Sequence, residues 1–133
     1  MQTNIEDTTL DELLSSLEPP YERPEHKTIG RTLDKYGIPF FYKQPILVYE
    51  NGGYKTEYPA FWLPAYGGAI IDHIAGPSSE LLSQKQSLYD RNQIPAVLIT
   101  DQQLKSQNWQ SNLYQKLDEI YRNASGFAPA GYK

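Results

Sequence analysis

One acidic side chain lies inside an apolar run, where a carboxylate is costly to bury. The segment AIIDHI, at residues 69–74, predicts a buried central strand because it is rich in β-branched residues. Asp72 lies within this strand, and a buried carboxylate requires polar partners or a raised pKa. We interpret Asp72 as part of a functional site or as the remnant of one.

The chain contains two histidines, His26 and His73, and no cysteine. Disulfide scaffolds, thiol nucleophiles, iron–sulfur clusters and cysteine-based zinc sites are therefore excluded, and any metal would be bound by oxygen or histidine. His73 follows Asp72 directly, but neighbouring residues in a strand face opposite ways. We expect no metal shared by Asp72 and His73, and a hydrogen-bonded or exposed role for both histidines.

Glu25 lies in the first turn of a helix predicted over residues 24–36. Pro24 fits the first turn of this helix, and Gly37 supplies a left-handed stop. Glu25 lies one turn before Ile29, which predicts a side chain directed toward the sheet. A carboxylate there also complements the helix dipole, an effect under about 1 kcal/mol, so a site role and a structural role both stay open.

The chain has eleven tyrosines, and aromatic residues cluster between residues 54 and 66. Such side chains stack on unpaired bases or anchor a protein interface, although in a small sheet protein they more often form core and rim. The phosphate-binding patterns GxGxxG and GxxxxGK[ST] and the serine-hydrolase pattern GxSxG are absent. The sequence gives no support to nucleotide hydrolysis or to a serine hydrolase.

The apolar pattern predicts the order of secondary structure after the first helix. Strands are predicted at PFFYK, QPILVYE and YKTEYPAFWL, with a hairpin turn at Asn51-Gly52-Gly53 because these residues tolerate positive φ. The two antiparallel strands that flank this turn, the first formed by PFFYK and QPILVYE, make a three-stranded meander with AIIDHI. A helix from Ser78 to about Asn92, the strand AVLIT at 96–100, a turn capped by Asp101 and a final helix follow, the last with an apolar stripe of Trp109, Leu113, Leu117 and Ile120.

A strand reached through a helix implies parallel pairing. The predicted fold class is therefore α/β, with a mixed sheet of four or five strands flanked by helices. With 133 residues the chain fits one compact domain. We expect an acidic N-terminal arm over residues 1–21, the folded domain over 22–123 and a flexible tail over 124–133.

Charge is distributed unevenly along the chain. Residues 1–22 carry six acidic and no basic side chains, whereas the remainder, with twelve basic and ten acidic side chains, is about +2. The formal net charge of −4 therefore does not exclude nucleic acid as a partner. No apolar run approaches the roughly 20 residues of a membrane helix, and acids stand where a signal peptide would carry lysines. We expect a cytoplasmic protein.

The phrases LDKYGIPFFYKQP, YPAFWLPAYGGAIIDHIAG and QSLYDRNQIPAVLIT follow one another in a way that resembles the PD-(D/E)XK, or restriction-endonuclease-like, superfamily. The resemblance covers about residues 22–122 and implies the order helix, three strands, helix, strand, helix. It also implies a site in which acids on the second and third strands bind Mg²⁺. A lysine on the third strand then orients the attacking water, and a first-helix glutamate assists.

Two positions depart from this pattern. Glu25 matches the first-helix glutamate and Asp72 the third-strand acid, but Ala60 stands in place of the second-strand aspartate and Ile74 in place of the lysine. Alanine offers no oxygen to a metal, and isoleucine offers no charge. We therefore favour a member of the superfamily that has lost metal-dependent cleavage and needs no cofactor.

The alternative is a weak or rearranged endonuclease that uses Mg²⁺ or Mn²⁺. In it Glu57 replaces the missing metal ligand beside Asp72, and Lys85 replaces the lysine, with Glu25 assisting. Against it, Glu57 lies three residues before Ala60 and in a regular strand faces the other way.

The favoured function is a binding module within a nucleic-acid-processing assembly, with a protein or DNA as partner and no membrane. A basic face would favour nucleic acid, whereas exposed leucines and tyrosines would favour a protein. A homodimer formed through the sheet edge or the arm is also open. The candidate binding residues are Arg23, Lys27, Arg31, Tyr58, Trp62 and Tyr66, and the candidate interface residues of the arm are Leu10, Leu13, Leu14 and Leu17.

Overall fold

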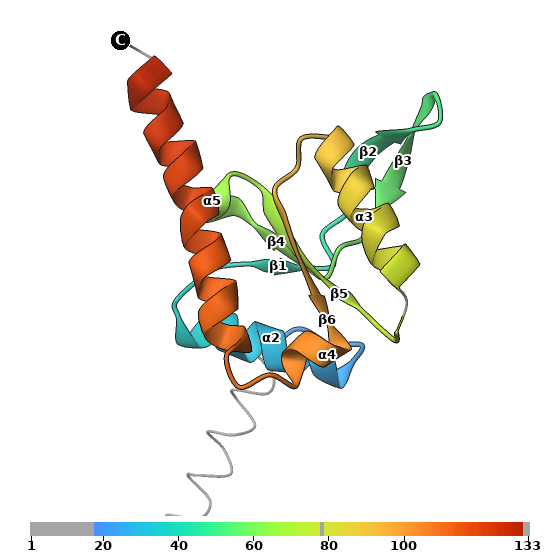
Figure 1. Ribbon diagram of the computed structural model, residues 1–133, viewed down its shortest axis with the longest axis vertical. Helices are drawn as coiled ribbons and strands as arrows, with labels where there is room; N and C mark the ends of the chain where they lie inside the picture. The colour runs from blue at the N-terminus through green and yellow to red at the C-terminus, as the bar shows by residue number, and fades with distance from the viewer. Residues whose placement is uncertain (1–17, 78, 132–133) are drawn as a thin grey trace, which may run out of the picture.

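The computed structural model describes residues 18–77 and 79–131, with side-chain positions as far as residue 123. Figure 1 shows a central sheet with helices on both sides and a separate hairpin next to one of them. Most of the predicted arm, including Leu10, Leu13, Leu14 and Leu17, lies outside the described residues. Among the described residues, no helix combines the length and apolar character that a membrane crossing requires.

The first described helix, α2 (Pro24–Lys35), confirms the prediction for residues 24–36. Pro24 occupies its first turn, where a missing N–H costs no helical hydrogen bond. Ile29 and Leu33 are fully buried on the face toward the sheet. Gly37, with a φ of 70°, ends the helix as predicted.

The main sheet has four strands in the order β1 (Phe41–Tyr42), β4 (Phe61–Leu63), β5 (Ala69–Ile74) and β6 (Ala96–Thr100). β1 with β4 and β4 with β5 pair antiparallel, whereas β5 and β6 pair parallel. Helix α3 (Ser79–Arg91) makes the crossover that this parallel pair requires. The mixed sheet of four strands flanked by helices is the α/β arrangement that the sequence predicted.

The predicted meander is divided between two sheets. β2 (Ile46–Glu50) and β3 (Gly53–Glu57) form a separate two-stranded hairpin, and its turn uses the positive φ angles of Asn51 and Gly52. The long return strand expected at 54–63 is interrupted at Tyr58-Pro59. Proline has no N–H for a sheet ladder, so β3 ends there and β4 begins at Phe61 in the other sheet.

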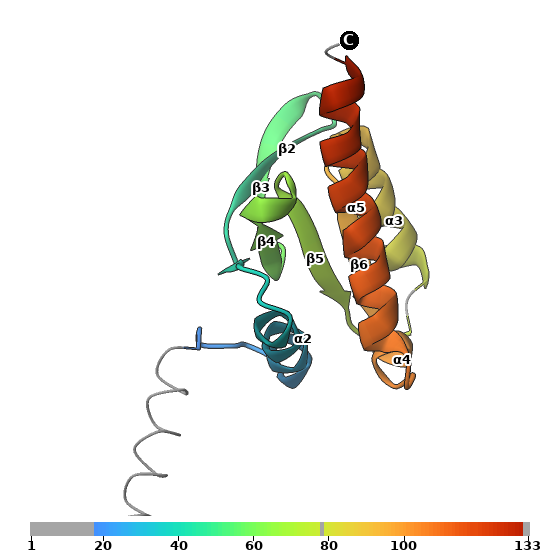
Figure 2. The ribbon, with the colours of Figure 1, turned by 90° about the vertical axis from the view of Figure 1, so that its left-hand side faces the viewer.

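The two faces of the main sheet bury different sets of side chains. One face packs on α2 and α5 (Trp109–Gly131), where Leu113 and Leu117 confirm part of the predicted apolar stripe. The other packs on α3 and the β2–β3 hairpin, through Tyr89 among others. Figure 2 shows the length of α5 beside the sheet and α2 at the end of the sheet nearest α4 (Asp101–Leu104). The short helix η1 (Pro64–Tyr66) joins β4 to β5.

Two predicted details require correction. Thr100, not Asp101, caps α4: its side chain accepts a hydrogen bond from the Gln103 N–H, and Asp101 is the first helical residue. The segment expected as a loose tail over 124–133 is helical as far as Gly131. Extending a helix costs far less than starting one, and the stripe beginning at Trp109 supplies the start.

Candidate functional site

Strand β5 directs its successive side chains to opposite faces of the sheet. Asp72 faces α3, near Tyr89, whereas His73 faces α2, where its ring lies 5.8 Å from the ring of His26. Glu25 lies on the α2 face with His73. Glu25 and Asp72, which the resemblance places in one site, are therefore not brought together.

The Asp72 carboxylate is surrounded by hydrogen-bond donors. Its Oδ1 accepts from the backbone N–H of Ala60 at 3.3 Å and from that of His73 at 3.0 Å. Its Oδ2 accepts from the Tyr89 hydroxyl at 3.4 Å. Both carboxylate oxygens are thus engaged by the protein itself, which is how buried polar groups are normally stabilised.

Burial governs the electrostatics of this carboxylate. Loss of solvent raises the pKa of Asp72, and the hydrogen bond from Ala60 and the charge of Lys85 oppose that rise. The pKa of the Tyr89 phenol is also raised, by burial first and then by the charges of Asp72 and Glu57. Tyr89 therefore stays protonated and remains a donor to Asp72.

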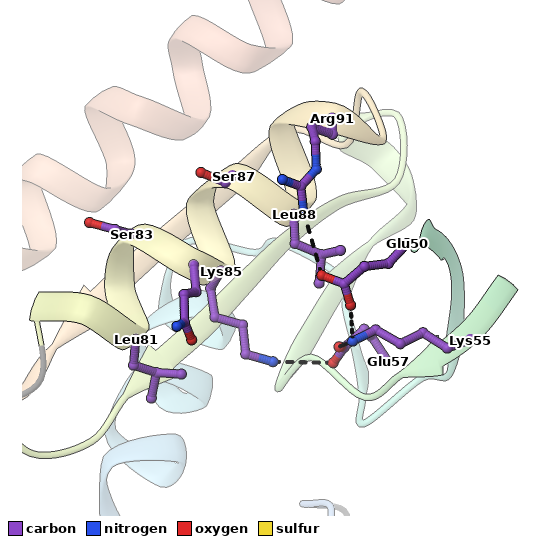
Figure 3. A pocket seen from close by; sticks show the side chains of 10 residues that line it. Glu50, Lys55, Glu57, Leu81, Ser83, Lys85, Ser87, Leu88 and Arg91 are labelled. Atoms are coloured by element: carbon purple, nitrogen blue, oxygen red, sulfur yellow. Dashed lines mark hydrogen bonds and ion pairs between the residues drawn. The ribbon is translucent and has the colours of Figure 1, made fainter. Parts of the chain in front are cut away.

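Glu57 and Lys85, the residues of the rearranged-nuclease alternative, do lie on the Asp72 side of the sheet. Lys85 Nζ is 3.1 Å from Glu57 Oε2, and Figure 3 shows these side chains pointing toward each other from α3 and β3. Glu57 also pairs with Lys55 at 3.4 Å. The expectation that Glu57 faces away from this side is wrong, because the break at Tyr58-Pro59 removes the regular alternation between Glu57 and Ala60.

These ion pairs line an open pocket of about 550 Å³ between the hairpin and α3. Glu50 accepts from Lys55, and Arg91 Nη2 lies 3.5 Å from Glu50 Oε2 (Figure 3). Each cation that lines the pocket thus has a carboxylate partner. Asp72 belongs to no group of three His, Asp or Glu side chains with ligand atoms within 4.8 Å of one another in the described part of the chain.

Ala60 and Ile74 close the positions where the superfamily pattern has aspartate and lysine. Ala60 is 0% and Ile74 2% exposed, and both are packed in the apolar core. Neither supplies an oxygen or a charge, so the polar groups around Asp72 come from the backbone, Tyr89 and the pocket.

No known family, curated protein or solved structure matches this chain. The resemblance to the PD-(D/E)XK superfamily therefore rests on the sequence phrases alone.

The candidate basic residues Arg23, Lys27 and Arg31 follow one another at intervals of four residues from the N-cap of α2, which places them on one face of that helix. Arg23 lies 3.6 Å from Glu25, and Arg31 lies 2.8 Å from Glu18. Lys27 is exposed on α2, on the other side of the sheet from Lys85. The three residues of α2 are thus separated by the sheet from Lys85, and two of them, Arg23 and Arg31, lie beside acidic side chains.

The candidate aromatic residues differ in exposure. Tyr58 is exposed at the end of the hairpin. Trp62 is half-buried, with its ring 5.8 Å from that of Phe41, and Tyr66 lies 5.7 Å from Tyr121. Only Tyr58 of the three candidates is exposed for a partner.

The outer face of the hairpin is apolar and exposed, a feature that the sequence analysis did not single out. Leu47 is 64% and Tyr54 72% exposed, and Tyr49 packs edge-on against Tyr54 at 5.1 Å. These three side chains share the face opposite Val48, which is fully buried. In the sequence, the alternation of Leu47, Val48 and Tyr49 indicates that Leu47 and Tyr49 share one face, but not which face is exposed.

Sequence analysis also missed the association of His73 with Asp101. His73 Nε2 lies 2.5 Å from Asp101 Oδ1, and the Gly76 N–H donates to Asp101 Oδ2 at 2.9 Å. The available signal was the parallel pairing predicted for strand 96–100, whose partner in the structure is 69–74, because parallel strands end at the same edge of a sheet.

Proposed function

We propose that this chain is a non-cleaving binding module on a restriction-endonuclease-like fold, and that its partner in a nucleic-acid-processing assembly is a protein. The observation that carries the proposal is the uncharged, exposed outer face of the β2–β3 hairpin. The fold rests on the order of the helices and strands, and the loss of cleavage rests on the hydrogen bonds of Asp72.

The order of elements supports the restriction-endonuclease-like fold. Helix α2 is followed by the antiparallel strands β1, β4 and β5, then by α3 and by β6 parallel to β5. This is the order that the sequence resemblance implies, apart from the β2–β3 hairpin inserted between β1 and β4.

The state of Asp72 supports the loss of cleavage. A metal-binding carboxylate must direct oxygen lone pairs at the ion, whereas Asp72 receives donors from Ala60, His73 and Tyr89. Ala60 contributes no carboxylate of its own. The residual acid thus holds the start of β4 to β5 as a structural hydrogen-bond acceptor.

The hairpin face favours a protein partner. Leu47, Tyr49, Tyr54 and Thr56 occupy this face, none of them charged, and Tyr58 extends it. Exposed aromatic and aliphatic side chains that cluster together are typical of protein interfaces, in which tyrosine supplies much of the contact area. The partner we infer presents an apolar surface to this face.

The same face is poorly suited to nucleic acid. Binding to a phosphate backbone requires cations beside the stacking aromatics. Within the hairpin the one cation is Lys55, which points to the opposite face and pairs with Glu50 and Glu57.

The rearranged endonuclease is the second candidate, and the position of Glu57 and Lys85 beside Asp72 favours it. Against it, Lys85 is bound to Glu57 and Glu25 lies on the other face of the sheet.

A comparison of co-purified proteins tests the partner proposal. The tagged chain, a Leu47→Thr/Tyr54→Thr variant and a Tyr114→Gln/Tyr121→Gln control are used in parallel, with quantitative mass spectrometry. Threonine suits a strand and glutamine a helix, and all four residues are exposed, so both variants should fold. We expect at least one protein that the wild type and the control retain and the hairpin variant loses about tenfold or more. Identical recovery by all three chains would contradict the hairpin as the binding face.

A further inference from the structure

Three potential metal ligands meet at the edge of the sheet where β5 and β6 end. Glu25 comes from the first turn of α2, His73 from the penultimate position of β5, and Asp101 from the residue after β6. One ligand atom from each lies within 4.8 Å of the other two. These residues are distant in sequence, and the parallel register pairs His73 with Ile99, two residues before Asp101, so that both strands bring their side chains to the same edge of the sheet.

The polar atoms of this cluster are incompletely satisfied. The His73 side chain is only 1% exposed, and its Nδ1 is buried without a hydrogen-bond partner. Glu25 Oε1 is likewise buried without a hydrogen bond, its nearest cation being Arg23 at 3.6 Å. Buried polar atoms without partners are costly, and an ion bound by Glu25 compensates for that cost at Oε1, whereas His73 faces the cluster through Nε2.

The hydrogen bonds of Asp101 are those expected of a carboxylate that binds a metal ion. The Gly76 N–H occupies Oδ2 and fixes the carboxylate, while Oδ1 faces His73. Metal-binding carboxylates are commonly held in this way by a hydrogen bond to the oxygen that does not bind the ion. The Asp101 carboxylate is therefore held with Oδ1 directed toward the cluster.

We propose that Glu25, His73 and Asp101 form a binding site for a borderline divalent cation of the Zn²⁺ type. One imidazole nitrogen with two carboxylate oxygens is a ligand set that suits Zn²⁺, whereas Mg²⁺ and Ca²⁺ favour oxygen alone. Three protein ligands leave a fourth position for water. The site lies on the face of the sheet opposite Asp72 and is independent of the hairpin and its partner.

Ion entry requires a small local rearrangement. Ligand atoms at about 2.1 Å from a tetrahedral ion lie about 3.4 Å apart, so the His73–Asp101 contact opens by about 1 Å. Glu25 and Arg23 are both partly exposed, which allows the Glu25 carboxylate to turn toward the ion and Arg23 to move away.

The test is calorimetric titration of the whole chain with Zn²⁺ at neutral pH, with Co²⁺ absorption as a second readout. We compare the wild type with Glu25→Gln and Asp101→Asn, since both residues are partly exposed and both changes keep the side-chain shape. Glu80→Gln is the matched control, because Glu80 is also acidic and also lies in the first turn of its helix, outside the cluster. Circular dichroism verifies that each variant is folded.

We expect one Zn²⁺ per chain in the wild type and the control, and binding about tenfold or more weaker in both cluster variants. Co²⁺ should give visible bands in the wild type that the cluster variants lack, and Mg²⁺ should bind much more weakly than Zn²⁺. Absence of Zn²⁺ binding, or binding unchanged in both cluster variants, would overturn the proposal. Mg²⁺ binding as tight as that of Zn²⁺ would overturn the role of His73.

Discussion

The backbone N–H of Ala60 donates to Asp72 Oδ1 over 3.3 Å, so a residue whose side chain has no polar atom supports the Asp72 carboxylate through its backbone. This hydrogen bond joins the start of β4 to the middle of β5. It gives Asp72 a structural role between these two strands.

Replacing Asp72 with Ala and with Asn distinguishes two roles of this residue, a structural hydrogen-bond acceptor and a charged metal ligand. Asp72→Ala leaves the donors of Ala60 and Tyr89 without a partner, and we expect it to lower the free energy of unfolding by about 1–3 kcal/mol. Asp72→Asn keeps an accepting oxygen and removes a buried charge, so it should cost less than Asp72→Ala. Urea unfolding of the wild type and the two variants measures their order of stability. An Asn variant less stable than the Ala variant would contradict the role of Asp72 as a structural acceptor.

Gly30 in α2 is required by the close approach of Tyr21. A Cβ at residue 30 would lie 2.6 Å from Tyr21 Cζ, and Tyr21 packs on the core rings of Tyr42 and Phe61. We therefore expect Gly30→Ala to destabilise the protein by about 1–3 kcal/mol, although alanine normally favours a helix.

The control for this substitution is Gly53→Ala, where a Cβ would meet no atom within 4 Å. A double-mutant cycle with Tyr21→Ala assigns the cause, because Gly30→Ala should cost little once the tyrosine ring is removed. An equal cost of Gly30→Ala with and without the ring would show that the clash is not responsible.

Tyr21 also lowers the stability of the folded protein at alkaline pH. Burial raises its pKa from 10.0 to about 12, with smaller contributions from Asp34 and Glu18. The folded state thus holds the phenol proton more tightly than the unfolded chain, so the stabilisation is full below pH 10 and falls as pH rises to about 12. Tyr89 acts in the same direction, and only a comparison with a variant isolates Tyr21.

The measurement is the free energy of unfolding of the wild type and of Tyr21→Phe at several values between pH 9 and pH 12, a range set by that pKa shift. The wild type should lose stability more steeply than the variant over the upper part of this range. Parallel curves would mean that Tyr21 titrates in the folded protein as it does in the unfolded chain.

Local signals predicted much of the fold. Pro24 and Gly37 marked the limits of the first helix, and the apolar run at 96–100 predicted a strand with parallel pairing, which the structure pairs with 69–74. The break at Pro59 was missed although a proline is itself a signal that a strand ends; that the two halves join different sheets depends on tertiary contacts and could not be predicted.

The candidate site was less accessible to sequence reasoning. Alternation along β5 did predict that Asp72 and His73 face opposite ways. Which face packs on α2 depends on tertiary contacts such as those of Ile29 and Leu33 with the sheet, and this choice placed Glu25 with His73 instead of Asp72. The exposure of Leu47 and Tyr54 similarly depends on where the hairpin meets α3.

The most direct test of the central claim, that the chain does not cleave nucleic acid, is a titration with Mg²⁺ and Mn²⁺ on plasmid, single-stranded and branched DNA. Wild type and Asp72→Asn are compared, since the asparagine variant should remain folded. We predict no metal-dependent cleavage by either chain. Cleavage by the wild type that Asp72→Asn abolishes would contradict the claim and would identify Glu57 and Lys85, beside Asp72, as the replacement groups of an active nuclease.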